Sequence, residues 1–195
     1  MINNMFTTRR SRLPQKGFTI IETLMAVLVL SIAIAGSLAL ASKGLSAIQA
    51  ARQEVNAVYL AQNAMEYIRQ LRDTNCLAAS GSVATCPTGA WLGTAPNNIA
   101  SKCGDSGGCE VDTLSGTVTV CPSAGCDVLN YDAVNTLYTY SGVGTTPTAF
   151  TRTIYVQSPV GGNANEASTT VLVRWLGQGG VVRSMRIHDD LYNWQ

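Results

Sequence analysis

The sequence predicts an α+β fold in which a long N-terminal helix packs on an antiparallel sheet, and two patterns support this. Residues 23–42 are twenty consecutive uncharged residues, and apolar residues at near-helical spacing continue beyond Lys43. In the C-terminal half, short segments alternate apolar and polar residues, which is typical of half-buried strands. A chain of 195 residues has room for such a helix and one modest globular domain.

The apolar run is about long enough to span the core of a bilayer. Four basic residues lie before it with no acidic residue among them: Arg9, Arg10, Arg12 and Lys16. The positive-inside rule therefore predicts a cytoplasmic N-terminus and places everything after Lys43 outside the cytoplasm. All six cysteines follow the run, which fits an oxidising compartment.

The charge is unevenly distributed along the chain. The net charge is +1, but residues 1–17 carry +4, so residues 18–195 hold 9 basic and 12 acidic residues, or −3. Five basic residues lie among the aromatic residues of the C-terminal part: Lys102, Arg152, Arg174, Arg183 and Arg186. Glu166, Asp189 and Asp190 nearly cancel the arginines near the C-terminus, so no nucleic-acid partner is expected.

Glu22 places one carboxylate at the near edge of the apolar run, where a charged residue costs free energy on insertion. The segment around it, Lys16–Leu24 with the sequence KGFTIIETL, resembles the class III signal of type IV pilins and type II secretion pseudopilins. The resemblance implies that a prepilin peptidase cuts after Gly17 on the cytoplasmic side and N-methylates Phe18. It also implies that Glu22 meets the terminal amine of a neighbouring subunit, a pairing that limits the cost of removing both charges from water.

The resemblance implies a pilin-like fold and a structural function as a pilin or minor pilin of a type IV pilus-like filament. The expected partners are the prepilin peptidase and other pilin subunits. The precursor is expected in the inner membrane as a single-pass protein, and the product in an extracellular pilus or periplasmic pseudopilus. Two alternatives are a type II secretion pseudopilin and a signal-anchored adhesion or DNA-uptake module.

Residues 43–75 are expected to form an amphipathic helix that packs on the sheet. Arg69 and Asp73 are spaced for a weak ion pair near its end, whereas Glu54 fits the apolar side poorly. Ala51 and Ala61 fill the gaps in the expected apolar face, whose large residues follow near-helical spacing: Leu45, Ile48, Val55, Val58, Met65, Ile68 and Leu71.

The remainder divides into a connecting segment, residues 76–116, and a sheet head, residues 117–195. The connecting segment is rich in small and polar residues, has Trp91 as its one large anchor, and is expected to be a disulfide-tied loop. Leu191 and Trp194 are expected to dock on the head. Five strand signals follow the loop, the last two as a hairpin: 117–121, 137–140, 150–156, 169–176 and 181–188. Two segments are predicted before these. Residues 1–17 form a cytoplasmic leader that is removed, and residues 18–42 form the helix that spans the membrane or lies in the filament core.

The cysteine spacing favours disulfides over a metal site, since it contains no C-x-x-C pair and the only histidine, His188, is distant along the chain. Six cysteines allow fifteen pairings. Within these, we favour the local set: Cys76 with Cys86, Cys103 with Cys109, and Cys121 with Cys126.

No catalytic residue, cofactor or metal is expected. His188, Asp189 and Asp190 offer a base and a carboxylate, but no nucleophile elbow or glycine-rich phosphate loop accompanies them, so they are interpreted as a strand end entering a solvated turn. Three acids in a glycine-rich stretch could offer oxygen ligands to calcium: Asp105, Glu110 and Asp112. Their spacing does not fit an EF-hand, and they are interpreted as solvated side chains.

Overall fold

The computed structural model describes residues 17–84, 86–94, 98–104, 106–140, 142 and 144–193. The chain divides into two compact units, Met1–Ser46 and Ala47–Gln195, and helix α1 (Ile20–Ser80) contributes residues to both. The predicted α+β class, with a long apolar helix followed by an antiparallel sheet, is confirmed.

Helix α1 begins immediately after Thr19. The hydroxyl and the carbonyl of Thr19 accept hydrogen bonds from the Glu22 N–H at 3.3 and 3.1 Å. A threonine that caps a helix and is followed three residues later by glutamate is a common pattern for the start of a helix. The sequence therefore contains a local signal for the position at which the apolar helix starts.

The other end of α1 lies at Ser80, so the expected end near residue 75 is wrong. The helix stops at Gly81, which has φ +70° and donates its N–H to the Leu77 carbonyl at 2.9 Å. Glycine adopts this left-handed conformation at little cost, which makes it a frequent helix stop. The extra turn contains Cys76, which is buried and joined to Cys86.

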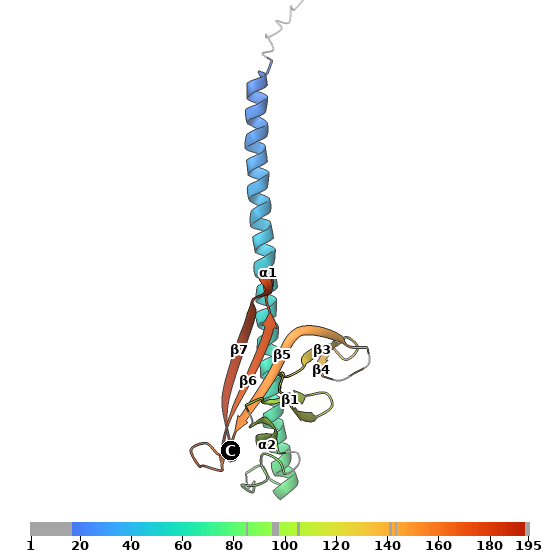
Figure 1. Cartoon of the computed structure of the whole chain (residues 1–195), viewed down its shortest axis with the longest axis vertical. Helices are drawn as coiled ribbons and strands as arrows, with labels where there is room; N and C mark the ends of the chain where they lie inside the picture. The colour runs from blue at the N-terminus through green and yellow to red at the C-terminus, as the bar shows by residue number, and fades with distance from the viewer. Residues whose placement is uncertain are drawn as a thin grey trace, which may run out of the picture. The chain divides into compact units, whose positions relative to one another are not determined.

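The second unit contains a seven-stranded antiparallel sheet. Its strands are β1 (Cys109–Asp112), β2 (Thr117–Val120), β3 (Val128–Asp132), β4 (Leu137–Thr139), β5 (Thr146–Gln157), β6 (Glu166–Leu176) and β7 (Val182–Tyr192). Strand β5 is central, because it pairs with β6 along one edge and with both β1 and β3 along the other. Figure 1 shows β5, β6 and β7 side by side as the long strands of the sheet.

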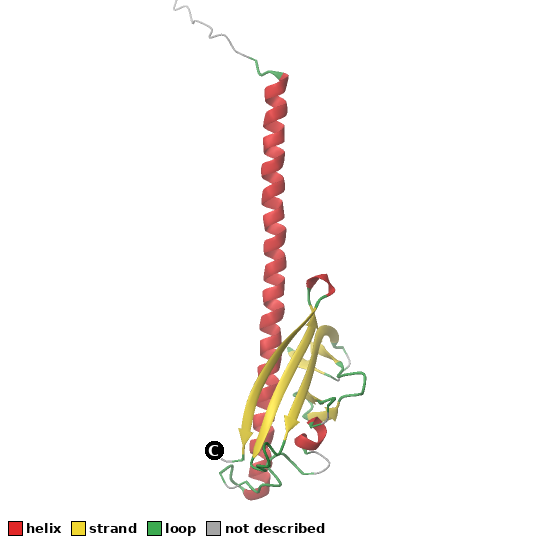
Figure 2. Ribbon diagram, turned by 60° about the vertical axis from the view of Figure 1, so that its left-hand side comes forward, coloured by secondary structure: helices red, strands yellow, loops and turns green. Residues whose placement is uncertain are grey.

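The sheet covers one side of α1 within the second unit, as Figure 2 shows. The buried helix residues form a stripe that is rich in alanine: Ala57, Leu60, Ala61, Ala64, Met65 and Ile68. The predicted apolar face is therefore only partly correct. Met65 and Ile68 are buried, but Leu45, Ile48 and Val55 are more than half exposed. Ala61 is buried as predicted, but Ala51 is exposed, and the buried Ala57 and Ala64 were not predicted. Small residues let a sheet approach the helix backbone closely, whereas the prediction relied mainly on the large apolar residues.

The segment expected as a connecting loop contains two regular elements, α2 (Ile99–Cys103) and strand β1. The side chain of Asn98 caps α2 by accepting the Ser101 N–H at 3.0 Å. Trp91 is buried as expected of an anchor, and its Nε1–H donates to the Ala164 carbonyl at 3.2 Å. Strand β1 was not predicted: its four residues, Cys109–Asp112, alternate apolar and polar types over too short a stretch to stand out, and all four are buried.

The predicted hairpin is present as β6 and β7, both longer than expected. Val171, Val173 and Trp175 on β6 are buried, and Leu191 on β7 is buried as well. Trp194 lies outside the described residues. Because β7 continues to Tyr192, the segment after His188 is strand rather than the predicted turn.

Two ion pairs join α1 to β7 and show which partners the charged residues Glu54 and Arg69 of the helix have. Glu54, which fitted the apolar side poorly, pairs with Arg183 at 2.9 Å. Arg69 pairs with Asp189 at 2.8 Å and with Glu66 at 3.4 Å. The expected Arg69–Asp73 pair is not formed, because Asp73 pairs with Arg72 instead.

Candidate functional site

The most extensive candidate for function is the exposed apolar surface of the first unit. Every described residue from Gly17 to Ser46 is exposed, and Phe18 and Ile20 are exposed by 80% and 82%. This part of α1 is long and apolar enough to cross a membrane. A continuous helix satisfies its own backbone hydrogen bonds, so lipid or apolar neighbours can cover such a surface without a polar cost.

The residues of the predicted processing signal lie at the start of this surface. Gly17 and Phe18 precede the helix, and Glu22 occupies its first turn. A Cβ atom added at Gly17 would meet no atom within 4 Å. The fold itself therefore does not require glycine at this position. A carboxylate in the first turn interacts favourably with the positive end of the helix dipole.

In the second unit, one buried cation joins the sheet to the helix. Arg152 on β5 is fully buried. Its Nη1 donates to the Leu60 carbonyl at 3.1 Å and to Asn63 Oδ1 at 3.3 Å, both on α1, and its Nη2 donates to the Val111 carbonyl on β1 at 2.6 Å. Burial lowers the pKa of the Arg152 guanidinium, which is partly offset by Tyr140 and Asp112. One side chain thus ties three elements together.

Asp112 and Tyr140 complete this buried polar network. Asp112 accepts the Thr139 hydroxyl at 2.8 Å and the Leu114 N–H at 3.0 Å. The Tyr140 hydroxyl donates to the Arg152 carbonyl at 3.0 Å, and burial raises the pKa of Tyr140 to about 12. Because the Asp112 carboxylate and the Tyr140 hydroxyl are occupied by protein partners, the network supports the fold rather than offering reactive groups to a substrate.

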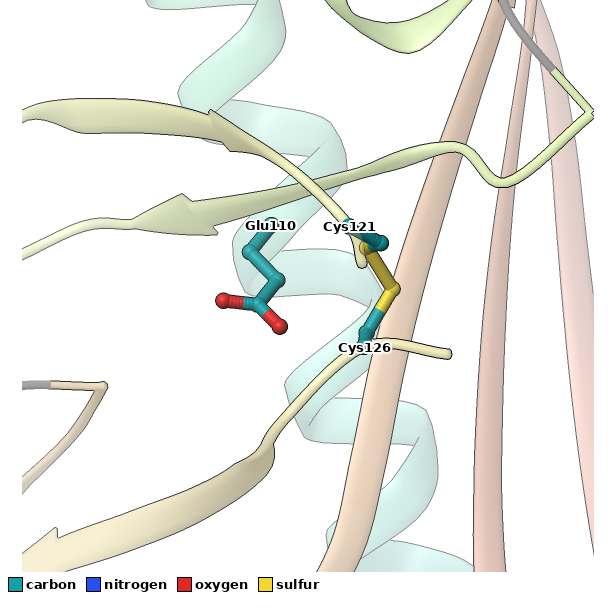
Figure 3. Close-up of side chains that lie close together, drawn as sticks. All are labelled: Glu110, Cys121 and Cys126. Atoms are coloured by element: carbon teal, nitrogen blue, oxygen red, sulfur yellow. A yellow bond between two sulfur atoms is a disulfide. The ribbon is translucent and has the colours of Figure 1, made fainter. Parts of the chain in front are cut away.

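Glu110 lies beside the disulfide of Cys121 and Cys126, as Figure 3 shows. One carboxylate oxygen and the two sulfur atoms are all within 4.8 Å of one another. The sulfurs are bonded to each other, so neither is a thiolate that could hold a metal ion. Burial raises the pKa of Glu110, opposed in part by the hydrogen bond that its Oε1 accepts from the Asp127 N–H.

The possible calcium ligands are only partly within the described residues, since Asp105 lies outside them. Glu110 and Asp112 are buried on β1, so the interpretation of these two acids as solvated is wrong. Both carboxylates instead accept hydrogen bonds from the chain itself, Glu110 from Asp127 and Asp112 from Leu114 and Thr139.

The three disulfides join Cys76 with Cys86, Cys103 with Cys109, and Cys121 with Cys126. Each closes a short stretch of chain between α1 and β3, where the second unit has its least regular structure. Cross-links of this kind limit the freedom of the unfolded chain and hold irregular segments that a small core does not.

Of the three residues that could suggest an enzyme, His188 and Asp190 lie side by side, whereas Asp189 is turned away from them. His188 lies 3.1 Å from the Thr170 hydroxyl and 3.3 Å from Asp190, on the exposed face of β7. Asp189 points to the opposite face, where it pairs with Arg69 on α1. Strand alternation thus separates the imidazole from the adjacent carboxylate.

The basic residues of the C-terminal part, from Lys102 onward, are also dispersed. Arg152 is buried, Arg183 pairs with Glu54, and the Lys102 ammonium donates to the Val118 carbonyl at 2.8 Å. Arg174 and Arg186 are exposed on the other face of the sheet. These residues do not build the continuous basic surface that binds a nucleic-acid backbone.

A comparison with family models matches residues 12–38 to the prokaryotic N-terminal methylation motif. The matched segment contains Gly17, Phe18 and Glu22 and ends within the apolar part of α1. No curated protein and no solved structure matches the chain. The family match therefore covers only the N-terminal segment, and the sheet of the second unit lies outside it.

Proposed function

We propose that this chain, which carries the prepilin signal of type IV pilins and pseudopilins, is a pilin or minor pilin that forms part of a type IV pilus-like filament. The observation that carries the proposal is the methylation motif at residues 12–38 leading directly into an exposed apolar helix. Such a surface is unstable in water and needs lipid or other apolar helices around it.

In this proposal the precursor is anchored in the inner membrane with its N-terminus in the cytoplasm. Prepilin peptidase cuts after Gly17 and N-methylates Phe18, and the subunit then leaves the lipid for the filament. Glu22 pairs with the terminal amine of a neighbouring subunit, so both charges leave water together. Contacts between unlike surfaces of identical or related subunits do not close, and so they propagate as a helical filament.

The head supports a structural role. Its buried polar groups, centred on Arg152, bind α1 and β1 together, and its disulfides secure the irregular segments. These contacts stabilise the fold of the head, as a structural subunit requires. A type II secretion pseudopilin is the second candidate, because the methylation motif serves both classes. Recovery of the chain in filaments sheared from the cell surface would favour the pilin.

The decisive experiment is mass spectrometry of the mature N-terminus. We expect N-methylated Phe18 as the first residue. Gly17→Val should leave the uncut precursor in the membrane, because a bulkier residue obstructs the peptidase while the open surroundings of Gly17 spare the fold.

Gly44→Ala is the matched control, since Gly44 is equally open but lies outside the matched motif. It should be cut like the wild type. A mature protein that begins at Met1, or normal cutting of Gly17→Val, would contradict the proposal.

A further inference from the structure

A polar hollow of about 490 Å³ lies on the face of the sheet turned away from α1. Its floor is formed by Thr151, Thr153 and Tyr155 of β5 and by Arg174 of β6. These positions alternate along β5 with Arg152, which reaches α1, and Arg174 is paired with Thr151 across the strands. The hollow therefore lies on the face of the sheet opposite to the one that packs on α1 within the second unit.

The walls of the hollow are two short segments closed by disulfides. One precedes Cys109, which is joined to Cys103, and the other runs from Cys121 to Cys126. Gly108, with φ +70°, lets the first wall lie directly on the floor, because a Cβ there would be 2.6 Å from Thr153 Cγ2.

The second wall also touches the floor. The Thr153 hydroxyl lies 3.0 Å from Cys126 Sγ and is the donor, since a disulfide sulfur carries no proton. Both walls are thus held in place before any ligand arrives, which reduces the entropy lost on binding.

The lining of the hollow combines one cationic side chain with several hydroxyl groups. Arg174 is the only charged side chain among the described residues that line the hollow. Among the described residues, its guanidinium makes no ion pair or hydrogen bond, and neither do the hydroxyls of Ser106, Ser123 and Tyr155. A guanidinium fork matches a carboxylate, and the surrounding hydroxyls match a ligand that carries hydroxyl groups of its own.

We propose that this hollow binds a sugar that carries one carboxylate, such as a uronic acid. One guanidinium balances one negative charge, whereas a polyanionic chain such as nucleic acid needs a row of cations. Arg186, the other exposed arginine of this face, is diagonal to Arg174 across β6 and β7 and does not line the hollow. The free sugar acid and a sugar acid at the end of a polymer present the same group to Arg174.

The test uses the full-length chain in nonionic detergent and saturation-transfer NMR with three probes: sodium glucuronate, glucose and acetate. Glucuronate should receive saturation from the protein at millimolar concentration and bind more tightly than either control. Arg174→Gln should weaken glucuronate binding by roughly tenfold to a hundredfold, the effect of losing a charged hydrogen bond. Arg186→Gln, which makes the same charge change outside the hollow, should bind like the wild type.

Equal binding of glucose and glucuronate would overturn the role of the carboxylate, and equal binding of acetate would overturn the role of the sugar hydroxyls. Equal weakening by Arg174→Gln and Arg186→Gln would show a general charge effect and overturn the site. Absence of any glucuronate signal from the wild type would overturn it as well. A uronic acid oligomer, used as a fourth probe, distinguishes the free sugar acid from a sugar acid at the end of a polymer. If the hollow accepts a chain end, the oligomer should bind as well as the free acid, and if it accepts only the free acid, the oligomer should bind more weakly.

Discussion

Arg152 shows how a single residue can determine the way a helix and a sheet meet. Its guanidinium is fully buried and donates to carbonyl groups of Leu60 on α1 and Val111 on β1. Burying a cation costs free energy unless its donors find partners, and here Nη1 and Nη2 both donate hydrogen bonds. Because its two terminal nitrogens point in different directions, the guanidinium can bind carbonyl groups of two different elements at once.

Arg152→Lys should lower the free energy of unfolding by about 2–4 kcal/mol, since a shorter ammonium keeps the desolvation cost but cannot satisfy both carbonyls. Denaturant unfolding of the full chain in detergent, followed by tryptophan fluorescence, measures this. Arg174→Lys is the matched control on an exposed arginine and should change stability by less than about 0.5 kcal/mol. Equal effects of the two substitutions would argue against the bridging role.

Glu110 is the residue from which we expect a pH dependence. Burial raises its pKa above the ordinary value of 4.5, so the folded protein holds this proton to a higher pH than the unfolded chain does. The stability that Glu110 contributes is therefore complete below pH 4.5 and is lost as the pH rises through its folded pKa.

Glu110→Gln removes this titration while keeping a side-chain oxygen for the Asp127 N–H. The free energy of unfolding of the variant minus that of the wild type should increase with pH above about 4.5 and then level off. Urea unfolding at a series of pH values from 4 to 8 measures the difference. A difference that stays constant over this range would refute the assignment.

At the scale of elements, α1 within the second unit has two unlike faces. The face that includes Ile68 is fully buried against the sheet, whereas Ile48 is 53% exposed. Exposed apolar residues also include Val55 and Tyr59, which the sheet does not cover. The helix therefore stabilises the head with one face and leaves the other available.

Ile68→Ala should lower the free energy of unfolding by about 2–5 kcal/mol, because it leaves a cavity in the core. Ile48→Ala, the same substitution on the exposed face, should change it by less than about 0.5 kcal/mol. Denaturant unfolding of the full chain distinguishes them. A loss at Ile48 as large as that at Ile68 would mean that the two faces have been assigned the wrong way round.

At the scale of the whole molecule, the chain combines an apolar helix that needs partners with a head that satisfies its own core. The first unit exposes its apolar side chains, and the second buries Trp91, Ile99 and Leu129 among others. A subunit with this division can change its apolar surroundings while its head stays folded. Transfer from a bilayer to a filament requires such independence.

Glu22→Ala should permit cutting after Gly17 and yet reduce incorporation into filaments, because the terminal amine of a neighbouring subunit then lacks its carboxylate. Mass spectrometry reports the cut, and the amount of the chain in sheared filaments reports incorporation. Thr23→Ala, one residue further along the same helix turn, is the control and should assemble. Normal filaments from Glu22→Ala would refute the pairing role.

The sequence by itself determined the N-terminal helix, the class of the fold and the processing signal, because each depends on local information. Charge order around Gly17, twenty uncharged residues and strand alternation in β6 can all be read without knowing the tertiary contacts. The matched methylation motif lies in this locally specified part.

Only the tertiary structure decided which face of α1 is buried and how the polar residues of the head are used. Ala57 and Ala64 face the sheet instead of Ile48 and Val55, since close approach of the sheet favours small side chains. Glu110 and Arg152 are polar residues whose burial depends on partners distant in sequence, and no local pattern reveals such partners. The same long-range pairing of β5 with β6 brings Arg174 beside the disulfide-closed walls and creates the hollow.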